Sequence, residues 1–129
     1  MPRIFALVAT LFSLAACAPA PKALALPDAV AGGWKRTSAA GILKQDAPGR
    51  IATLDLTMAM RGVYDGPTTV EVEVYQFGST SAAFEARQSW RPDGQRIVHQ
   101  RNELFITARS PQPDRSALES FVTALEKAL

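Results

Sequence analysis

Few residues in this sequence are of the types that carry catalytic or metal chemistry. Among 129 residues there is one cysteine, Cys17, and one histidine, His99. A disulfide framework, a thiolate zinc site and a multi-histidine metal site are therefore excluded within one chain. A Ser-His-Asp triad would have to use His99, but no G-x-S-x-G motif accompanies it. Walker and G-x-G-x-x-G motifs are absent too, so we expect an ordinary strand histidine, no metal and no cofactor.

Glu71 and Glu73 are the candidates for acid–base catalysis. They lie two residues apart in the segment TTVEVEVYQF. On a strand, this spacing places both carboxylates on one face, about 6.6 Å apart, which suits paired acid–base work. Glutamate alternating with valine is also the ordinary pattern of a strand with one solvated face. We favour the solvated face, and the alternative is a small carboxylate-dependent hydrolase or carbohydrate-active enzyme.

Aromatic side chains are the candidates for binding a partner. Tyr75 and Phe77 share a strand face with the two glutamates, and Trp34 lies in an earlier segment. Either that face is covered by Trp34 and its segment, or it offers an apolar spot to a partner. The second half of the chain is also rich in arginine, at Arg87, Arg91, Arg96, Arg101 and Arg109. Acidic residues alternate with these arginines, so we expect a mixed, solvated surface there; the alternative is a basic surface that meets anionic lipid or an acidic polymer.

The first residues have the layout of an export signal. Arg3 supplies one positive charge, and residues 4–16 follow without a charge. This run is shorter than the roughly 20 apolar residues that span a bilayer, and a proline-rich stretch with Lys22 comes directly after it. Residues 1–16 are therefore expected to be a signal peptide and not a transmembrane helix.

The run ends in Leu14-Ala15-Ala16-Cys17, which resembles the lipobox of bacterial lipoproteins. This resemblance implies lipid on the Cys17 thiol, cleavage before Cys17, acylation of the new N-terminus and membrane contact through that lipid. Ala18, the next residue, implies sorting to the outer membrane, facing the periplasm, if the host has one. The alternative is a conventional secretory signal in which Cys17 is an incidental small residue.

The rest of the chain divides into a tether and one domain. Residues 17–27 are rich in proline and alanine, which favours an extended tether. Residues 28–129 hold the periodic patterns, and 47% hydrophobic with 20% charged residues is typical of a globular chain. Once Arg3 is removed, the basic and acidic side chains nearly balance, so we expect no nucleic acid partner.

Strands are predicted where apolar residues alternate. Residues 51–60 and 68–77 show this pattern, with a reversing loop expected over 61–67 because it holds two glycines and a proline. Residues 96–100 and 103–109 are predicted to form a tight hairpin. A further strand is expected within 33–43.

Two helices are predicted in the remaining segments. Residues 82–91 follow several candidate N-caps at 79–81, and the C-terminal helix is expected to begin with a capping box of Ser116 and Glu119. Its apolar residues recur at helical spacing: Leu118, Phe121, Val122, Leu125 and Leu129. We therefore expect an α+β fold, with an antiparallel sheet of four to five strands, both helices on one face, and the order strands-helix-strands-helix.

The chain also resembles small bacterial envelope domains of unknown function. The matching residues are Gly33-Trp34, the strand from Val70 to Tyr75, and Ala83-Phe84. The resemblance implies a fold and brings no known activity or catalytic residue. The hypothesis at this point is a lipid-anchored envelope protein that acts as a binding, accessory or scaffold domain and not as an enzyme. Its partners would be the membrane, through the lipid, and an envelope protein.

Overall fold

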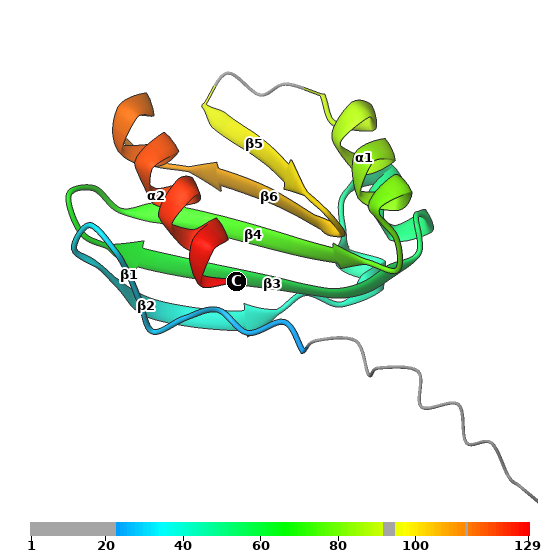
Figure 1. Ribbon diagram of the computed structural model, residues 1–129, viewed down its shortest axis with the longest axis horizontal. Helices are drawn as coiled ribbons and strands as arrows, with labels where there is room; N and C mark the ends of the chain where they lie inside the picture. The colour runs from blue at the N-terminus through cyan, green and yellow to red at the C-terminus, as the bar shows by residue number, and fades with distance from the viewer. Residues whose placement is uncertain (1–22, 92–94, 113) are drawn as a thin grey trace, which may run out of the picture.

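The computed structural model describes residues 23–91, 95–112 and 114–129 (Figure 1). The expected signal peptide, the lipobox and Cys17 lie outside these residues, so the expectations for them stay predictions. Within the described ranges, no helix is both long enough and apolar enough to cross a membrane.

The described residues form a six-stranded antiparallel sheet with two α-helices, which confirms the α+β class. The strands are β1 (Ala29–Val30), β2 (Trp34–Gly41), β3 (Leu56–Asp65), β4 (Val70–Phe77), β5 (Arg96–Arg101) and β6 (Leu104–Arg109), in the order β1-β2-β3-β4-β6-β5. The helices are α1 (Thr80–Ser89) and α2 (Arg115–Ala128). The expected number of four to five strands was too low. The additional strand is the two-residue β1, which pairs with the start of β2.

The order of elements also differs from strands-helix-strands-helix. Two short 3-10 helices, η1 (Lys44–Asp46) and η2 (Gly49–Thr53), lie between β2 and β3. The strand expected over 51–60 was therefore wrong at its start, where Ile51 is buried within η2. Asp55 has a φ of 52° and separates this helix from β3. Apolar residues spaced by two or three fit either element, so the pattern did not distinguish them.

The loop expected over 61–67 is mostly strand, because β3 runs on to Asp65. Gly62 lies inside the strand and is buried. A Cβ at this position would come within 2.6 Å of the Leu26 side chain. The glycine therefore permits close packing of the N-terminal segment on β3 and does not mark a turn.

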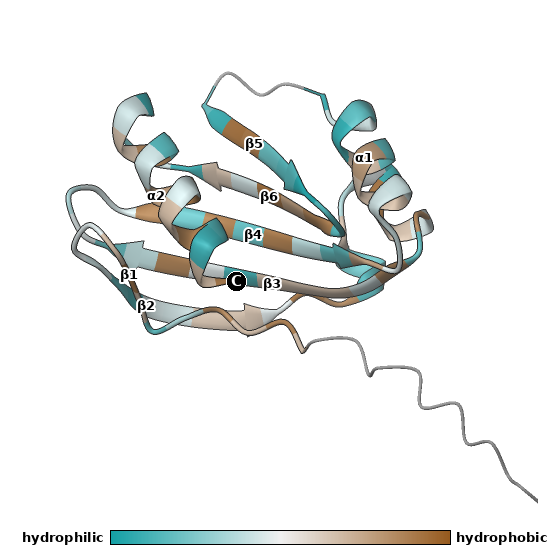
Figure 2. Ribbon diagram, in the orientation of Figure 1, coloured by the Kyte–Doolittle hydropathy of each residue, from teal (hydrophilic) through white to brown (hydrophobic). Residues whose placement is uncertain are grey.

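The two helices cover opposite faces of the sheet, and the expectation that both lie on one face was wrong. Along β4, Val70, Val72 and Val74 pack in the cluster that contains α2. Tyr75 and Phe77, on the other face, pack in the cluster that contains α1. Hydrophobic residues recur along β4 in Figure 2. Since both faces carry large apolar side chains, each needs a helix to exclude water.

The packing of α2 is centred on Phe121, whose ring centroid lies 5.3 Å from Trp34 and 5.0 Å from Tyr64. Its predicted apolar face is confirmed at its buried residues, which are Leu118, Phe121, Val122 and Leu125. The predicted capping box was wrong. The helix is capped by Asp114, whose side chain accepts a hydrogen bond of 3.0 Å from the Ala117 N–H. Glu119 instead pairs with Arg115 at 3.1 Å, one turn away.

The helix α1 is capped by Ser79, which accepts a hydrogen bond from the Ala82 N–H. It starts and ends two residues before the predicted bounds of 82–91. Ala83 and Ala86 are its buried residues. These small side chains let the helix backbone approach the aromatic residues of β4 and β6 closely.

The packed part of the chain begins before residue 28. Leu24 and Leu26, expected in the tether, are buried in the α2 cluster. The Tyr64 hydroxyl donates a hydrogen bond of 2.6 Å to the Pro27 carbonyl, and Arg36 donates one of 2.6 Å to the Leu26 carbonyl. The last residues of the expected tether are thus held against the sheet.

Tyr64 makes the stability of the fold sensitive to alkaline pH. Burial raises the pKa of this phenol from 10.0 to about 12, and Arg36 partly opposes the rise. The folded state therefore holds this proton more tightly than the unfolded state, so the contribution is complete below pH 10 and is lost as pH rises to 12. In urea unfolding at stepped pH, we expect stability to fall over this window, and to fall less steeply in Tyr64→Phe. Identical pH dependence in the two proteins would contradict this role.

Candidate functional site

The three aromatic residues proposed for binding are all buried. Tyr75, Phe77 and Trp34 are 0%, 2% and 3% exposed. The strand face that carries Tyr75 and Phe77 is covered, which decides the question that the sequence left open. The cover comes from α1 and Phe105, while Trp34 lies in the cluster on the opposite face. These side chains are therefore part of the two cores and form no spot on the described surface.

The two candidate carboxylates are both engaged by arginines. Glu71 pairs with Arg109 across β4 and β6. Glu73 pairs with Arg61 at 3.2 Å and Arg96 at 3.6 Å, and it accepts a hydrogen bond from the Tyr75 hydroxyl. Only 13% of the Glu73 side chain is exposed, so the expectation of a solvated face was wrong for this residue.

The Tyr75 phenol completes this arrangement around Glu73. Burial, and then the hydrogen bond to the Glu73 carboxylate, raises the pKa of Tyr75 far above its usual value. The hydroxyl therefore keeps its proton and acts as a donor to the carboxylate. The Glu73 carboxylate thus forms ion pairs with two arginines and accepts a hydrogen bond from a tyrosine hydroxyl. This arrangement suits a structural anchor for Arg96.

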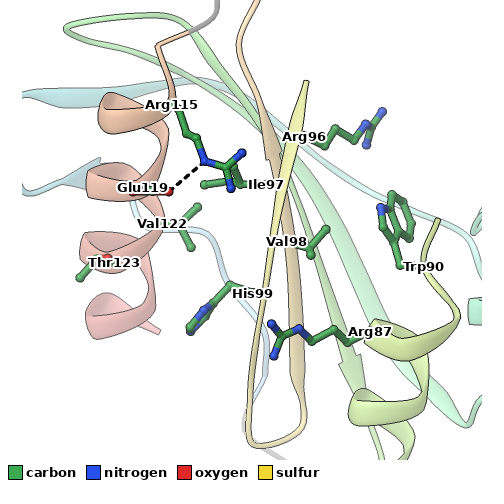
Figure 3. Close-up of a pocket in the computed structure, with 10 residues that line it drawn as sticks. All are labelled: Arg87, Trp90, Arg96, Ile97, Val98, His99, Arg115, Glu119, Val122 and Thr123. Atoms are coloured by element: carbon green, nitrogen blue, oxygen red, sulfur yellow. Dashed lines mark hydrogen bonds and ion pairs between the residues drawn. The ribbon is translucent and has the colours of Figure 1, made fainter. Parts of the chain in front are cut away.

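His99 lies on β5, as predicted, and its side chain points to the α2 side (Figure 3). There its Nε2 pairs with the Glu126 carboxylate of α2. Arg101 contacts the same carboxylate at 3.1 Å. His99 therefore helps to fix the C-terminal half of α2 to the outer strand.

A large hollow lies along β5, the outer strand of the sheet. We call it the β5 groove, and its volume is about 700 Å³. It is lined by Arg87, Trp90, Arg96, Ile97, Val98, His99, Arg115, Glu119, Val122 and Thr123. Figure 3 shows that these residues come from α2, from β5 and from the end of α1. The groove therefore occupies the space on both sides of a single strand.

Each side of β5 faces its own helix, which gives the groove two walls. Ile97 and His99 point toward α2, which contributes Val122, and we call this side the α2 wall (Figure 3). Arg96 and Val98 point the other way, toward Trp90 and α1, and we call this side the α1 wall. Side chains alternate between the walls because successive residues of a strand point to opposite faces.

The α1 wall combines an aromatic ring with several cations. The Arg96 guanidinium lies 6.0 Å from the centre of the Trp90 ring, a cation–π contact. A second hollow of about 360 Å³ adjoins Trp90 and is lined by Arg50 and Arg91. Arg87 extends toward β5 from the α1 side (Figure 3). Within the described ranges, the charged residues that line these two hollows on the α1 side are all arginines.

A smaller hollow of about 130 Å³ continues the groove past the start of β5. It shares Arg96, Ile97 and Arg115 with the β5 groove and adds Ser110 and Leu118. The two hollows together therefore follow the outer strand from Gln95 to His99. In the described parts of the chain, no group of three histidine, cysteine or acidic residues is placed to hold a metal ion.

Comparisons with known proteins give this chain no relative: no family model, no curated protein and no solved structure matches it. The sequence predicted β5, its hairpin partner β6 and the two helices, but it did not predict the β5 groove. The signal that could have indicated it is a short hairpin with one helix before it and one after it. Such a hairpin strand can lie at the sheet edge between the two helices.

Thr107 gives a test of the packing under the α1 wall. It faces Glu73 and Val98 in the sheet register, is 1% exposed, and its hydroxyl has no hydrogen-bond partner among the described residues. A buried, unpaired hydroxyl is destabilising, so Thr107→Val should increase the free energy of unfolding by about 1 kcal/mol. Urea denaturation measures the change.

Thr68→Val is the matched control, because the Thr68 hydroxyl is paired with the Ser110 hydroxyl at 2.8 Å. Removing it leaves Ser110, which is 5% exposed, without this partner. We expect this variant to lose about 1 kcal/mol. A destabilised Thr107→Val would show that its hydroxyl is paired in solution.

Proposed function

We propose that this protein is a lipid-anchored binding domain of the bacterial cell envelope, and that the β5 groove holds an anionic part of its partner. The observation that carries the proposal is the recess along the outer strand, walled by arginines and apolar side chains. In this proposal the domain serves as an accessory or scaffold protein and not as an enzyme.

The lining of the β5 groove supports a ligand with both anionic and apolar parts. Ile97, Val98 and Val122 supply apolar surface, and Trp90 adds an aromatic ring. Binding sites commonly combine such a lining with a few polar groups that fix orientation. Arg87 is exposed and makes no ion pair with another described residue, so its guanidinium can bind an incoming carboxylate or phosphate.

A carboxylate-dependent enzyme is supported less well. Glu71 and Glu73 do not line the β5 groove, and each is paired with arginine. General acid–base work needs carboxyl groups that can reach a bound substrate. Among the residues that the structure describes, the one acidic residue that lines the groove, Glu119, is paired with Arg115.

The groove is tested by titrating the full chain with poly-L-glutamate and with poly-L-lysine in a calorimeter. We expect poly-L-glutamate alone to bind, with an affinity that falls as salt is added. Arg87→Glu should weaken binding about tenfold, equivalent to about 1.4 kcal/mol. Lys35→Glu makes the same change of charge type on β2, near the opposite edge of the sheet, and should leave the affinity unchanged. Equal effects of the two substitutions would place binding elsewhere.

The anchor is tested at Cys17. The proposal expects mass spectrometry of the mature protein to find a lipid-modified cysteine as its first residue. Cys17→Ser replaces the thiol to which the lipid would be attached, so it should remove the modification. Retention in the membrane fraction should be lost with it, because durable attachment depends on the acyl chains. An unmodified terminus at another residue, or retention of the serine variant in membranes, would overturn this part of the proposal.

A further inference from the structure

We infer that the occupant of the β5 groove is an extended, acidic segment of a partner protein, which pairs with β5 as an additional strand. This inference rests on the proposed function and specifies the partner of the same groove. It follows from three features of the groove: the outer edge of β5, the alternation of its walls, and their charge.

The outer edge of β5 has no strand beside it among the described residues. β5 pairs with β6 on its inner side and is the last strand of the sheet. In an antiparallel pair, only alternate residues direct their N–H and C=O groups to the neighbour, and the remaining groups point outward. Such an edge is a template for pairing with another chain. At the opposite side of the sheet, β1 already pairs with part of β2.

The two walls match the geometry of an added strand. A strand beside β5 would direct successive side chains alternately to the α2 wall and the α1 wall. The α2 wall offers Ile97 and Val122, which suit apolar side chains. Strand addition of this kind takes affinity from backbone hydrogen bonds and specificity from pockets for alternate side chains.

The charge of the walls indicates the composition of the added strand. On the α2 wall, Arg115 is already paired with Glu119. Around Trp90 on the α1 side, the charged lining residues are Arg50, Arg87, Arg91 and Arg96. Among the described residues, Glu73 pairs with Arg96, and the four arginines outnumber this one carboxylate. Acidic side chains toward the α1 wall and apolar ones toward the α2 wall therefore make the best complement.

A second copy of this chain fits the groove less well. Pairing two β5 strands would bring the arginines of two α1 walls toward each other, and like charges at an interface oppose association. A bilayer of anionic lipids supplies negative charge but no backbone groups for the strand edge. Both remain as distinct outcomes of the experiment.

The probe is an eight-residue peptide of alternating Glu and Val with blocked ends, titrated into the full chain by calorimetry. Two analogues carry N-methyl groups on the backbone nitrogens of either the valines or the glutamates. Because N–H groups of alternate residues point to opposite edges of a strand, only one analogue loses the groups that face β5. We expect that analogue to bind at least about tenfold more weakly and the other to bind like the parent peptide. Arg87→Glu, shown to be folded by circular dichroism, should weaken the parent peptide, and Lys35→Glu should not.

The outcomes separate the inference from the proposed function. If the two analogues bind equally while poly-L-glutamate still binds in an Arg87-dependent manner, the groove binds anions and strand addition is wrong. If neither the peptide nor poly-L-glutamate binds, both proposals fail. Arg87-dependent binding to phosphatidylglycerol vesicles without peptide binding would overturn the inference in favour of lipid. Self-association in sedimentation that the peptide does not disturb would overturn it in favour of a second copy.

Discussion

The structure depends on burying both faces of the central strand β4. Three valines on one face and two aromatic residues on the other are almost completely excluded from water. One helix covers only one face of a sheet, so α1 and α2 must lie on opposite sides. Both helices also contact β5, the outer strand. The two walls of the β5 groove are therefore a consequence of how the core of the sheet is covered.

Glu73 connects that core to the surface. Its carboxylate lies on the α1 face, where burial without partners would be costly, and two arginines and a tyrosine hydroxyl compensate the charge. One of these partners, Arg96, also lies over the Trp90 ring in the groove. An anchored guanidinium loses less conformational freedom when a ligand binds beside it. The ion pair thus stabilises the sheet and holds a cation in place at the α1 wall.

The outer strand is six residues long and has an arginine at each end, Arg96 and Arg101. Natural edges are commonly short, charged or covered by another segment. Here the flanking helices lie on the two sides of β5 (Figure 3), and the β5 groove lies along the strand. The extended segment that we propose would reach the strand edge along this groove.

The sequence by itself determined the elements whose signals are local. Alternation in β4, the hairpin of β5 and β6, and the apolar face of α2 were all predictable, because each depends on spacing within one segment. One cysteine and one histidine also limited the available chemistry. Only the tertiary structure decided which face each helix covers, that β5 is the outer strand, and that Glu73 is paired while Tyr75, Phe77 and Trp34 are buried. These properties depend on contacts between residues far apart in the chain, which periodicity within a segment does not record.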